Sequence, residues 1–265
     1  MSTLHTRTTH VMCLGDSHTR AQVGVDYIRM LKERTAGRPY VFTNAGVNGD
    51  LAYNLLQRLD SVIEQQPDIV TVLIGTNDAN ASLSEKNTRM MTKMKKLHVT
   101  PTIDWYRENL AIIAARLSEE TDARVALLSL PVLGQEIDSE PVRRAGEYSE
   151  VVKETAAAYG VSYLPLYERQ LQHLRTVGRS PGIAFRDGRT LSSRAAMQHF
   201  LLGRSFDSIA RRRGLELTTD FIHQNSRGAA MIADLTEDFL RISKEEADNT
   251  KAASRSNGRC SAATK

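Results

Sequence analysis

The sequence contains very few cysteines. Only Cys13, within an apolar run, and Cys260, within a polar segment, occur among 265 residues. Two cysteines placed in this way give neither a disulfide framework nor the ligand spacing of a metal site. No cluster of histidine, cysteine and carboxylate residues predicts a bound metal elsewhere. We therefore expect no metal, no cofactor and a reducing, cytoplasmic location.

Long apolar runs are missing as well. No stretch approaches the roughly eighteen apolar residues of a membrane helix. The first apolar run extends only from Val11 to Leu14, which is too short for the core of a secretory signal. We expect no transmembrane segment. A chain of 265 residues that is 41% hydrophobic can bury one substantial core. We therefore predict a single domain over residues 1–243 and a polar, disordered tail over residues 244–265.

Neither sign of charge is scarce, but the charges are distributed unevenly. The 35 basic and 31 acidic residues leave a net charge of +4, and their mixing is typical of a solvated surface rather than of a nucleic-acid partner. Between Leu171 and Arg213, however, nine arginines accompany only Asp187 and Asp207, so this segment carries +7 and the rest of the chain −3. The positive excess is therefore confined to one segment.

Short β-rich apolar runs alternate with amphipathic helical patterns. The predicted strands are Thr9–Leu14, Tyr40–Thr43, Ile69–Ile74, Val125–Leu130 and Val161–Leu164. The predicted helices are Ala21–Arg34, Leu51–Glu64, Trp105–Glu119, Val142–Tyr159 and Asn225–Ile242. This alternation predicts an α/β fold, a three-layer α/β/α sandwich around a parallel five-stranded sheet. Two segments do not follow the alternation and are predicted to be inserts, at about residues 79–101 and 171–213.

Polar residues gather where the predicted strands end. Gly15-Asp16-Ser17-His18 follows the first strand, residues 44–50 follow the second, and Gly75-Thr76-Asn77-Asp78 follows the third. Far downstream, Asp220-Phe221-Ile222-His223 precedes the last helix. Because ligands bind at the carboxyl ends of the strands in open parallel sheets, these segments are the candidates for a functional site.

Each of these residues also has an ordinary structural interpretation. Ser17 and Asp220 are common helix-capping types, Asn77 is a common turn former, Gly49 can be a backbone hinge, and His223 can be a surface residue. Their joint occurrence at successive strand ends favours a shared chemical role. A serine nucleophile needs a base, the base needs a carboxylate, and the developing oxyanion needs fixed donors.

The residues at these positions meet those needs. Asp220 and His223, three positions apart, can contact each other directly and serve Ser17 as carboxylate and base. The N–H of Ser17, backbone near Gly49 and the side-chain amide of Asn77 are candidate donors for an oxyanion hole. We therefore predict Ser17, Asp220 and His223 as catalytic residues and Ser17, Gly49 and Asn77 as the oxyanion hole.

The sequence resembles the GDSL family, also called SGNH hydrolases. The four blocks of that family supply serine, glycine, asparagine and histidine, which are found here as Ser17 in GDS, Gly49 in VNGD, Asn77 in GTND and His223 in D-x-x-H. The resemblance spans residues 11 to about 240 outside the two inserts. It implies a flavodoxin-like fold, ester hydrolysis, and oxyanion donors from the same serine, glycine and asparagine.

Some positions depart from the family pattern. His18 stands where the family usually has leucine, and Gln224 where it often has proline after the histidine. Gly46 competes with Gly49 as the oxyanion glycine. His18 is a rival base, but its place next to the serine should turn its ring elsewhere, and it lacks a carboxylate partner at a useful spacing. Asp16 is expected to bond nearby loop amides rather than act in catalysis.

The residues and the resemblance together predict a serine hydrolase that cleaves acyl or acetyl esters through an acyl-enzyme. A lipase, esterase or lysophospholipase-like activity on a small, anionic or lipid-like ester is expected. In one hypothesis for the second insert, Arg211, Arg212 and Arg213 hold an anionic head group, while Met94 forms an adaptable pocket wall. The alternative is a packed surface segment with solvated arginines.

Two other functions remain open at this stage. An acyltransferase or a carbohydrate deacetylase would use the same site. A non-catalytic module would keep the fold and bind an anionic polymer or membrane through the basic insert.

Overall fold

A computed structural model of the chain describes residues 7–178, 183, 185 and 188–242. At its centre lies a five-stranded sheet in the order β2-β1-β3-β4-β5, in which every neighbouring pair is parallel. The strands are β1 (Thr9–Gly15), β2 (Tyr40–Gly46), β3 (Ile69–Leu73), β4 (Arg124–Leu128) and β5 (Ser162–Leu164). This is the strand order of flavodoxin-like folds, so the predicted α/β/α sandwich is confirmed.

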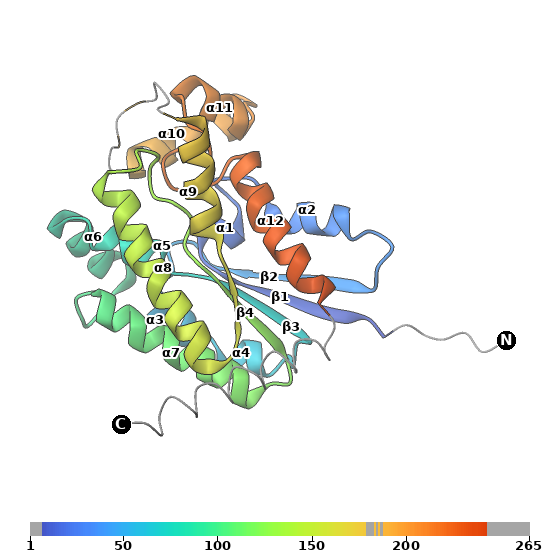
Figure 1. The fold of residues 1–265 in the computed structure, drawn as a ribbon. Coiled ribbons are helices and arrows are strands. Elements are labelled where there is room, and N and C mark those ends of the chain that lie inside the picture. The colour runs from blue at the N-terminus through green and yellow to red at the C-terminus, as the bar shows by residue number, and fades with distance from the viewer. Residues whose placement is uncertain (1–6, 179–182, 184, 186–187, 243–265) are drawn as a thin grey trace.

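Helices cover both faces of the sheet (Figure 1). One face carries α2 (Tyr27–Arg34), α9 (Leu166–Val177) and α12 (Ser226–Arg241), and the other carries α3 (Ala52–Leu56), α4 (Asp60–Ile63), α7 (Ile103–Glu120) and α8 (Glu140–Tyr159). Strand β1 shows how the sequence divides the layers. Val11 and Cys13 pack in the core beneath α2 and α12, whereas Met12 and Leu14 pack in the core beneath α7 and α8. Successive side chains of a strand point to opposite faces of the sheet.

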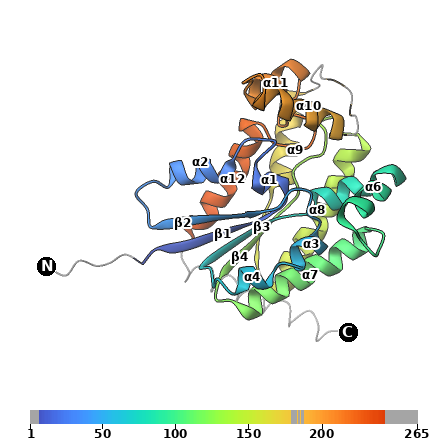
Figure 2. The ribbon, with the colours of Figure 1, turned by 180° about the vertical axis from the view of Figure 1, so that it is seen from behind.

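The remaining helices gather near the carboxyl ends of the strands. These are α1 (Ser17–Arg20), α5 (Thr76–Ala81), α6 (Glu85–Lys95), α10 (Gly188–Phe200) and α11 (Phe206–Arg213). Figure 2 shows α10 and α11 together at one end of the molecule, beyond α1 and α9, with α6 to one side. The polar segments predicted to carry the chemistry therefore lie at the same end as both predicted inserts.

The predicted strands each overlap an observed one, with the largest difference in β2. This strand continues to Gly46 instead of ending at Thr43, because it pairs with β1 along its whole length, up to Gly15 opposite Gly46. The extension matters because it brings the segment that follows Gly46 next to the turn that follows Gly15.

Two predicted helices were wrong in extent. The helix expected over residues 21–34 begins at Tyr27, where the carboxylate of Asp26 caps it by accepting from the N–H groups of Ile28 and Arg29. Residue Ala21, in a left-handed conformation with φ of 56°, ends α1 instead. The helix expected over residues 51–64 is divided into α3 and α4 by tight turns around residues 57–59.

The second predicted insert begins within a helix. Helix α9 runs through residue 171 and packs Leu171 and Leu174 with Met231 of α12, so the segment from 171 begins inside a helix of the sandwich. Residues 179–182, 184 and 186–187 of this segment, and the predicted tail at 244–265, lie outside the described residues. No helix in the described part of the chain has the length and apolar character needed to span a bilayer.

Gly46 offers a test of how tightly β2 packs on the turn after β1. A Cβ at this position would lie 2.3 Å from the N of Arg20 and 2.7 Å from the C of Thr19, both backbone atoms. We predict that Gly46→Ala lowers the free energy of unfolding by about 2–3 kcal/mol, measured by urea titration. Gly37→Ala is the control. Its φ of 83° strains the site, but an added Cβ would meet no atom of the described residues within 4 Å apart from its chain neighbours, so a loss of about 1 kcal/mol is expected. Equal losses would contradict the packing.

Candidate active site

Ser17 lies in a sharp turn between β1 and α1. It is the first residue of α1, and the carboxylate of Asp16 caps this helix by accepting from the N–H of His18 at 2.9 Å. The N–H of Ser17 is in the first helical turn and so has no partner within the helix. Only glycine fits immediately before this turn, since a Cβ at Gly15 would lie 2.4 Å from the carbonyl oxygen of Leu73.

His223 and Asp220 come from the loop before α12 and meet Ser17. The Nε2 of His223 lies 3.0 Å from the Oγ of Ser17, and its Nδ1 lies 2.8 Å from Oδ2 of Asp220. Hydroxyl, imidazole and carboxylate thus form a continuous hydrogen-bonded series. In this geometry an imidazole can remove the proton of a hydroxyl while a carboxylate fixes its tautomer.

The backbone of the loop holds Asp220 in place. Its Oδ1 accepts from the N–H of Ile222 at 3.1 Å and of His223 at 2.8 Å. Phe221, the residue between, has φ of 74°, a left-handed conformation that is unusual for a bulky residue. This strained turn folds the two N–H groups back onto the carboxylate.

Asp220 is completely buried and yet held in its ionised form. Burial by itself would raise the pKa of its carboxyl group, but the charge of His223 and hydrogen bonds from His223 and Ser192 outweigh it and lower the pKa. The carboxylate therefore faces Nδ1–H of His223, which leaves the lone pair of Nε2 directed at Ser17. The contact from Ser192 brings α10, within the second insert, to the site, and sequence reasoning missed it.

Asn77 joins the serine turn to the turn after β2. Its Nδ2 donates to the backbone oxygen of Asp50 at 3.0 Å and to Oδ2 of Asp16 at 3.2 Å. An amide nitrogen has two hydrogens, so both are engaged. Donation to a third acceptor requires release of one bond, and the bond to Asp16 is the longer.

Gly49 and Gly46 differ in whether the backbone N–H has an acceptor. The N–H of Gly46 donates to Oδ1 of Asn44 at 3.0 Å, so it is occupied. For Gly49, with φ of 73°, no acceptor for the N–H is found among the residues that the structure describes. Of the two glycines, Gly49 is therefore the one with a backbone donor available for a ligand.

Helix α6 of the first insert packs against the Gly49 turn. A Cβ at Gly49 would lie 3.2 Å from Cε of Lys95 and 3.4 Å from Cε of Met94. Lys95 also donates to Asn48 O at 3.0 Å and pairs with Asp50 at 2.9 Å. Met94 thus lies beside the predicted oxyanion glycine, with 42% of its surface exposed.

Asp50 and Asp78 anchor the same region. Besides Lys95, Asp50 binds Arg58 at 2.9 Å, and that guanidinium also donates to the carbonyl oxygen of Gly15 at 3.0 Å. Asp78 accepts from the N–H of Ala52 at 3.2 Å. Burial raises the pKa of Asp78 to about 8. Sequence reasoning gave neither carboxyl group a role, because their partners are distant in the sequence.

His18 has a carboxylate partner after all. Its Nδ1 lies 2.9 Å from Oδ1 of Asp16, and its Nε2 lies 3.0 Å from the carbonyl oxygen of Ile222. The expectation that no carboxylate was available is wrong, because the capping geometry of α1 turns Asp16 back over His18. Both ring nitrogens point away from the hydroxyl of Ser17 toward these acceptors.

The three arginines at the end of α11 do not form one cluster. Arg213 is half-buried and donates to the carbonyl oxygen of Thr219 at 2.6 Å, next to Asp220. Arg211 and Arg212 are exposed, and Arg211 lines a depression beside the start of α12. Arg213 thus supports the loop of Asp220, and only its two neighbours have exposed side chains.

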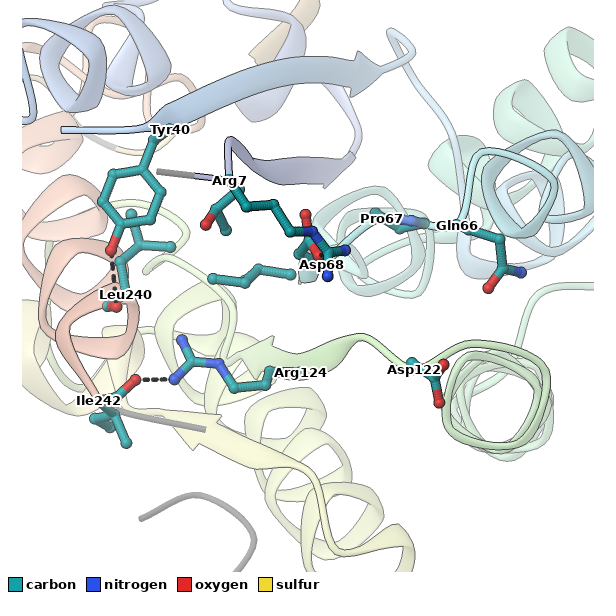
Figure 3. Close-up of a pocket in the computed structure, with 11 residues that line it drawn as sticks. Arg7, Tyr40, Gln66, Pro67, Asp68, Asp122, Arg124, Leu240 and Ile242 are labelled. Atoms are coloured by element: carbon teal, nitrogen blue, oxygen red, sulfur yellow. Dashed lines mark hydrogen bonds and ion pairs between the residues drawn. The ribbon is translucent and has the colours of Figure 1, made fainter. Parts of the chain in front are cut away.

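A separate pocket lies at the amino-terminal ends of the strands (Figure 3), where β1, β3 and β4 begin. Its basic side chains bind within the protein. Arg7 pairs with Asp68 at 2.7 Å, and Arg124 donates to the backbone oxygens of Phe239 and Ile242. Ser17 follows the other end of β1, so this pocket does not belong to the candidate site.

Solved structures resemble this chain in fold. A catalytic mutant of an acetylxylan esterase from Geobacillus stearothermophilus, Axe2, in which alanine replaces a serine, has a TM-score of 0.64 at 15% identity, covering 89% of this chain and 96% of its own. The acetyl xylan esterase AlAXEase has a TM-score of 0.62 at 19% identity, covering 87% and 99%. A lipase/acylhydrolase from Enterococcus faecalis has a TM-score of 0.56 at 21% identity, covering 88% and 95%.

Two other solved catalytic mutants of the Geobacillus stearothermophilus enzyme replace an aspartate and a histidine that lies three positions after it. No curated protein matches the chain by sequence. The model of the GDSL-like lipase/acylhydrolase family matches residues 13–231, which include all four blocks described above. The chain therefore belongs to the GDSL-like lipase/acylhydrolase family.

Proposed function

We propose that this protein is a serine esterase that hydrolyses carboxylic esters through an acyl-enzyme. The observation that carries the proposal is the series from Ser17 Oγ to His223 Nε2, at 3.0 Å, and from His223 Nδ1 to Asp220 Oδ2, at 2.8 Å. Family membership supports ester hydrolysis in general. The catalytic mutants of the Geobacillus stearothermophilus enzyme support the roles of a serine and of an aspartate and histidine three positions apart.

The geometry suggests a two-step reaction. Oγ of Ser17 attacks the ester carbonyl while Nε2 of His223 takes its proton, and His223 then returns that proton to the departing alcohol. Water, activated by the same imidazole, attacks the acyl-enzyme and releases the acid. Asp220 stays ionised throughout and stabilises the imidazolium that forms in each step.

The oxyanion of each tetrahedral intermediate needs donors near Ser17. We assign this role to the N–H groups of Ser17 and Gly49 and to the side-chain amide of Asn77. Because both hydrogens of that amide are engaged, Asn77 exchanges its 3.2 Å contact with Asp16 for the oxyanion. The neutral carbonyl oxygen of the substrate is a weaker acceptor than the carboxylate of Asp16, whereas the oxyanion is charged. The amide of Asn77 therefore binds the transition state in preference to the ground state.

We infer that the substrate is a small acyl or acetyl ester. Acetyl esters are favoured by the names of the acetylxylan esterases, and acyl esters by that of the lipase/acylhydrolase. Exposed Phe200, Leu201 and Leu202 at the end of α10, a helix that contacts Asp220 through Ser192, favour an apolar or lipid-like portion. Exposed Arg211 and Arg212 favour an anionic portion.

Labelling by a fluorophosphonate tests the nucleophile. We predict that the wild-type protein gains one adduct, located on Ser17 by mass spectrometry of peptides. Among the serines that the structure describes, Ser17 is the one whose Oγ lies within hydrogen-bond distance of an imidazole. Ser17→Ala should gain none and lose at least about 1000-fold in ester hydrolysis. Ser226→Ala is the matched control, since Ser226 also opens a helix but binds Asp207 at 2.7 Å.

That control should be labelled as the wild type is. An adduct on another serine, or hydrolysis that survives Ser17→Ala, would reject the proposed nucleophile. Salt-sensitive binding of an anionic polymer without labelling would instead support the non-catalytic module. Transfer of the acyl group to an added alcohol in preference to water would support an acyltransferase.

Asp220→Asn tests the orientation of the imidazole. An asparagine amide at this position can present its N–H to Nδ1, which favours the wrong tautomer of His223, so kcat should fall by about 1000- to 10,000-fold with little change in KM. Asp234→Asn is the control, because Asp234 pairs with Arg34 and Arg169 on the surface. Comparable activity in the two variants would exclude the assigned role of Asp220.

Charge reversal at α11 tests the anionic portion of the substrate. The double variant Arg211→Glu, Arg212→Glu should lower kcat/KM about 10-fold for an ester that carries a carboxylate, and leave a neutral short ester unchanged. Arg213 is left intact because it supports the Asp220 loop. Arg89→Glu is the control, because the Arg89 side chain is exposed and pairs with Glu85 of the same helix. Equal losses on both esters would show that these arginines do not bind substrate.

A further inference from the structure

The ring of His18 is buried beside the proposed catalytic residues but is not part of their series. None of its side-chain surface is exposed. Asp16, at 2.9 Å, faces Nδ1, and the carbonyl oxygen of Ile222, at 3.0 Å, faces Nε2. His18 therefore connects the serine turn to the peptide that directly precedes His223.

Both neighbours of the ring are hydrogen-bond acceptors. A backbone carbonyl oxygen can only accept, and an ionised carboxylate can only accept. A neutral imidazole carries one N–H and one lone pair, so in either tautomer one nitrogen would face an acceptor without a hydrogen. Only the imidazolium form donates to both.

We propose that His18 is held as an imidazolium cation at neutral pH and acts as a positioning residue for His223. Its Nε2–H donates to the carbonyl oxygen of Ile222 and so fixes that peptide. Its charge also repels a second positive charge close to the site. The ring centroids of His18 and His223 are 5.9 Å apart. The effect on catalysis rests on the proposed function, whereas the protonation state does not.

The surrounding charges support the cation. Burial lowers the pKa of His18, but the charge and hydrogen bond of Asp16, the Ile222 carbonyl and the charge of Asp220 together raise it above its ordinary value. The carboxylate of Asp16 also accepts from the N–H of His18 at 2.9 Å and from Nδ2 of Asn77 at 3.2 Å, so every polar group that faces it is a donor. The groups that face the ring are thus Asp16 and Ile222, with Asp220 and His223 beyond.

The protonation state can be measured directly on the wild-type full chain. In ¹⁵N-labelled protein at pH 8, both ring nitrogens of His18 should give signals of the protonated type, each with an attached hydrogen. Comparison with the spectrum of His18→Gln assigns them. One protonated and one unprotonated ring nitrogen would overturn the proposal, whatever the enzymatic activity. Fluorophosphonate labelling of Ser17 tests the proposed function separately.

The positioning role is tested by the pH dependence of ester hydrolysis. His18→Gln removes the cation and leaves a donor for Ile222. Because a positive charge close to the site is lost, the acid limb of the kcat/KM profile should move up by about one pH unit. At its optimum, kcat should fall about 10-fold with KM little changed. His173→Gln is the control, because His173 also lies near a carboxylate, 3.9 Å from Glu216, and should shift nothing.

A fall in kcat without movement of the acid limb would show a merely structural role and contradict the proposal.

The pH dependence of stability gives a second readout. Since folding raises the pKa of His18, its stabilising effect is complete below the ordinary value of 6.5 and is lost as the pH rises through the folded value. The difference in unfolding free energy between wild type and His18→Gln should therefore shrink at high pH. A constant difference would contradict the cation. If His18→Gln does not fold, the ¹⁵N spectrum of the wild type still decides, with the signals assigned through their connectivity to Asp16.

Discussion

The buried carboxylate of Asp220 is the group on which the geometry of the site depends. With no exposed surface, its charge is tolerable only because backbone N–H groups, the imidazole of His223 and the hydroxyl of Ser192 surround it. Removing one partner of a buried charge costs several kcal/mol. The loop before α12 is therefore fixed in the one conformation that satisfies Asp220, and the direction of His223 toward Ser17 follows from it.

The other end of the site is fixed by a second set of buried polar groups. Asn77 joins the turn of Asp16 to that of Asp50, and Arg58 joins Asp50 to the end of β1. Each bond connects segments that the parallel sheet brings to its carboxyl edge. Because the turns are bound to one another rather than only to the sheet, the donors assigned to the oxyanion hole keep their relative positions before a substrate arrives.

Both predicted inserts contact this arrangement. Met94 and Lys95 of α6 lie against the Gly49 turn, while Arg213 of α11 binds the loop of Asp220 and Ser192 of α10 binds its carboxylate. The helices that we propose to contact the substrate therefore also support the turns of the site.

The strands of the sheet were predictable from the sequence, because short apolar runs such as Val11 to Leu14 are typical of strands that are buried on both faces. The four blocks also predicted which strand ends carry polar groups. Helix bounds were less predictable, since Asp26 caps α2 in the middle of a pattern that continues without it.

Contacts that depend on the folded chain were not predictable. The pairing of His18 with Asp16 arises from the cap of α1, and its contact with Ile222 joins residues 204 positions apart. Ser192 and Arg213 are similar cases, because nothing near either residue in the sequence indicates that it supports Asp220.

The most direct test of the proposed nucleophile and oxyanion hole is a crystal structure of the protein after reaction with a phosphonate ester. We predict a bond from phosphorus to Ser17 Oγ. We also predict a phosphoryl oxygen within about 3 Å of the N atoms of Ser17 and Gly49 and of Asn77 Nδ2, with the contact between Asn77 and Asp16 broken. An adduct whose oxygen points to solvent, with Asn77 still bound to Asp16, would contradict the proposed oxyanion hole.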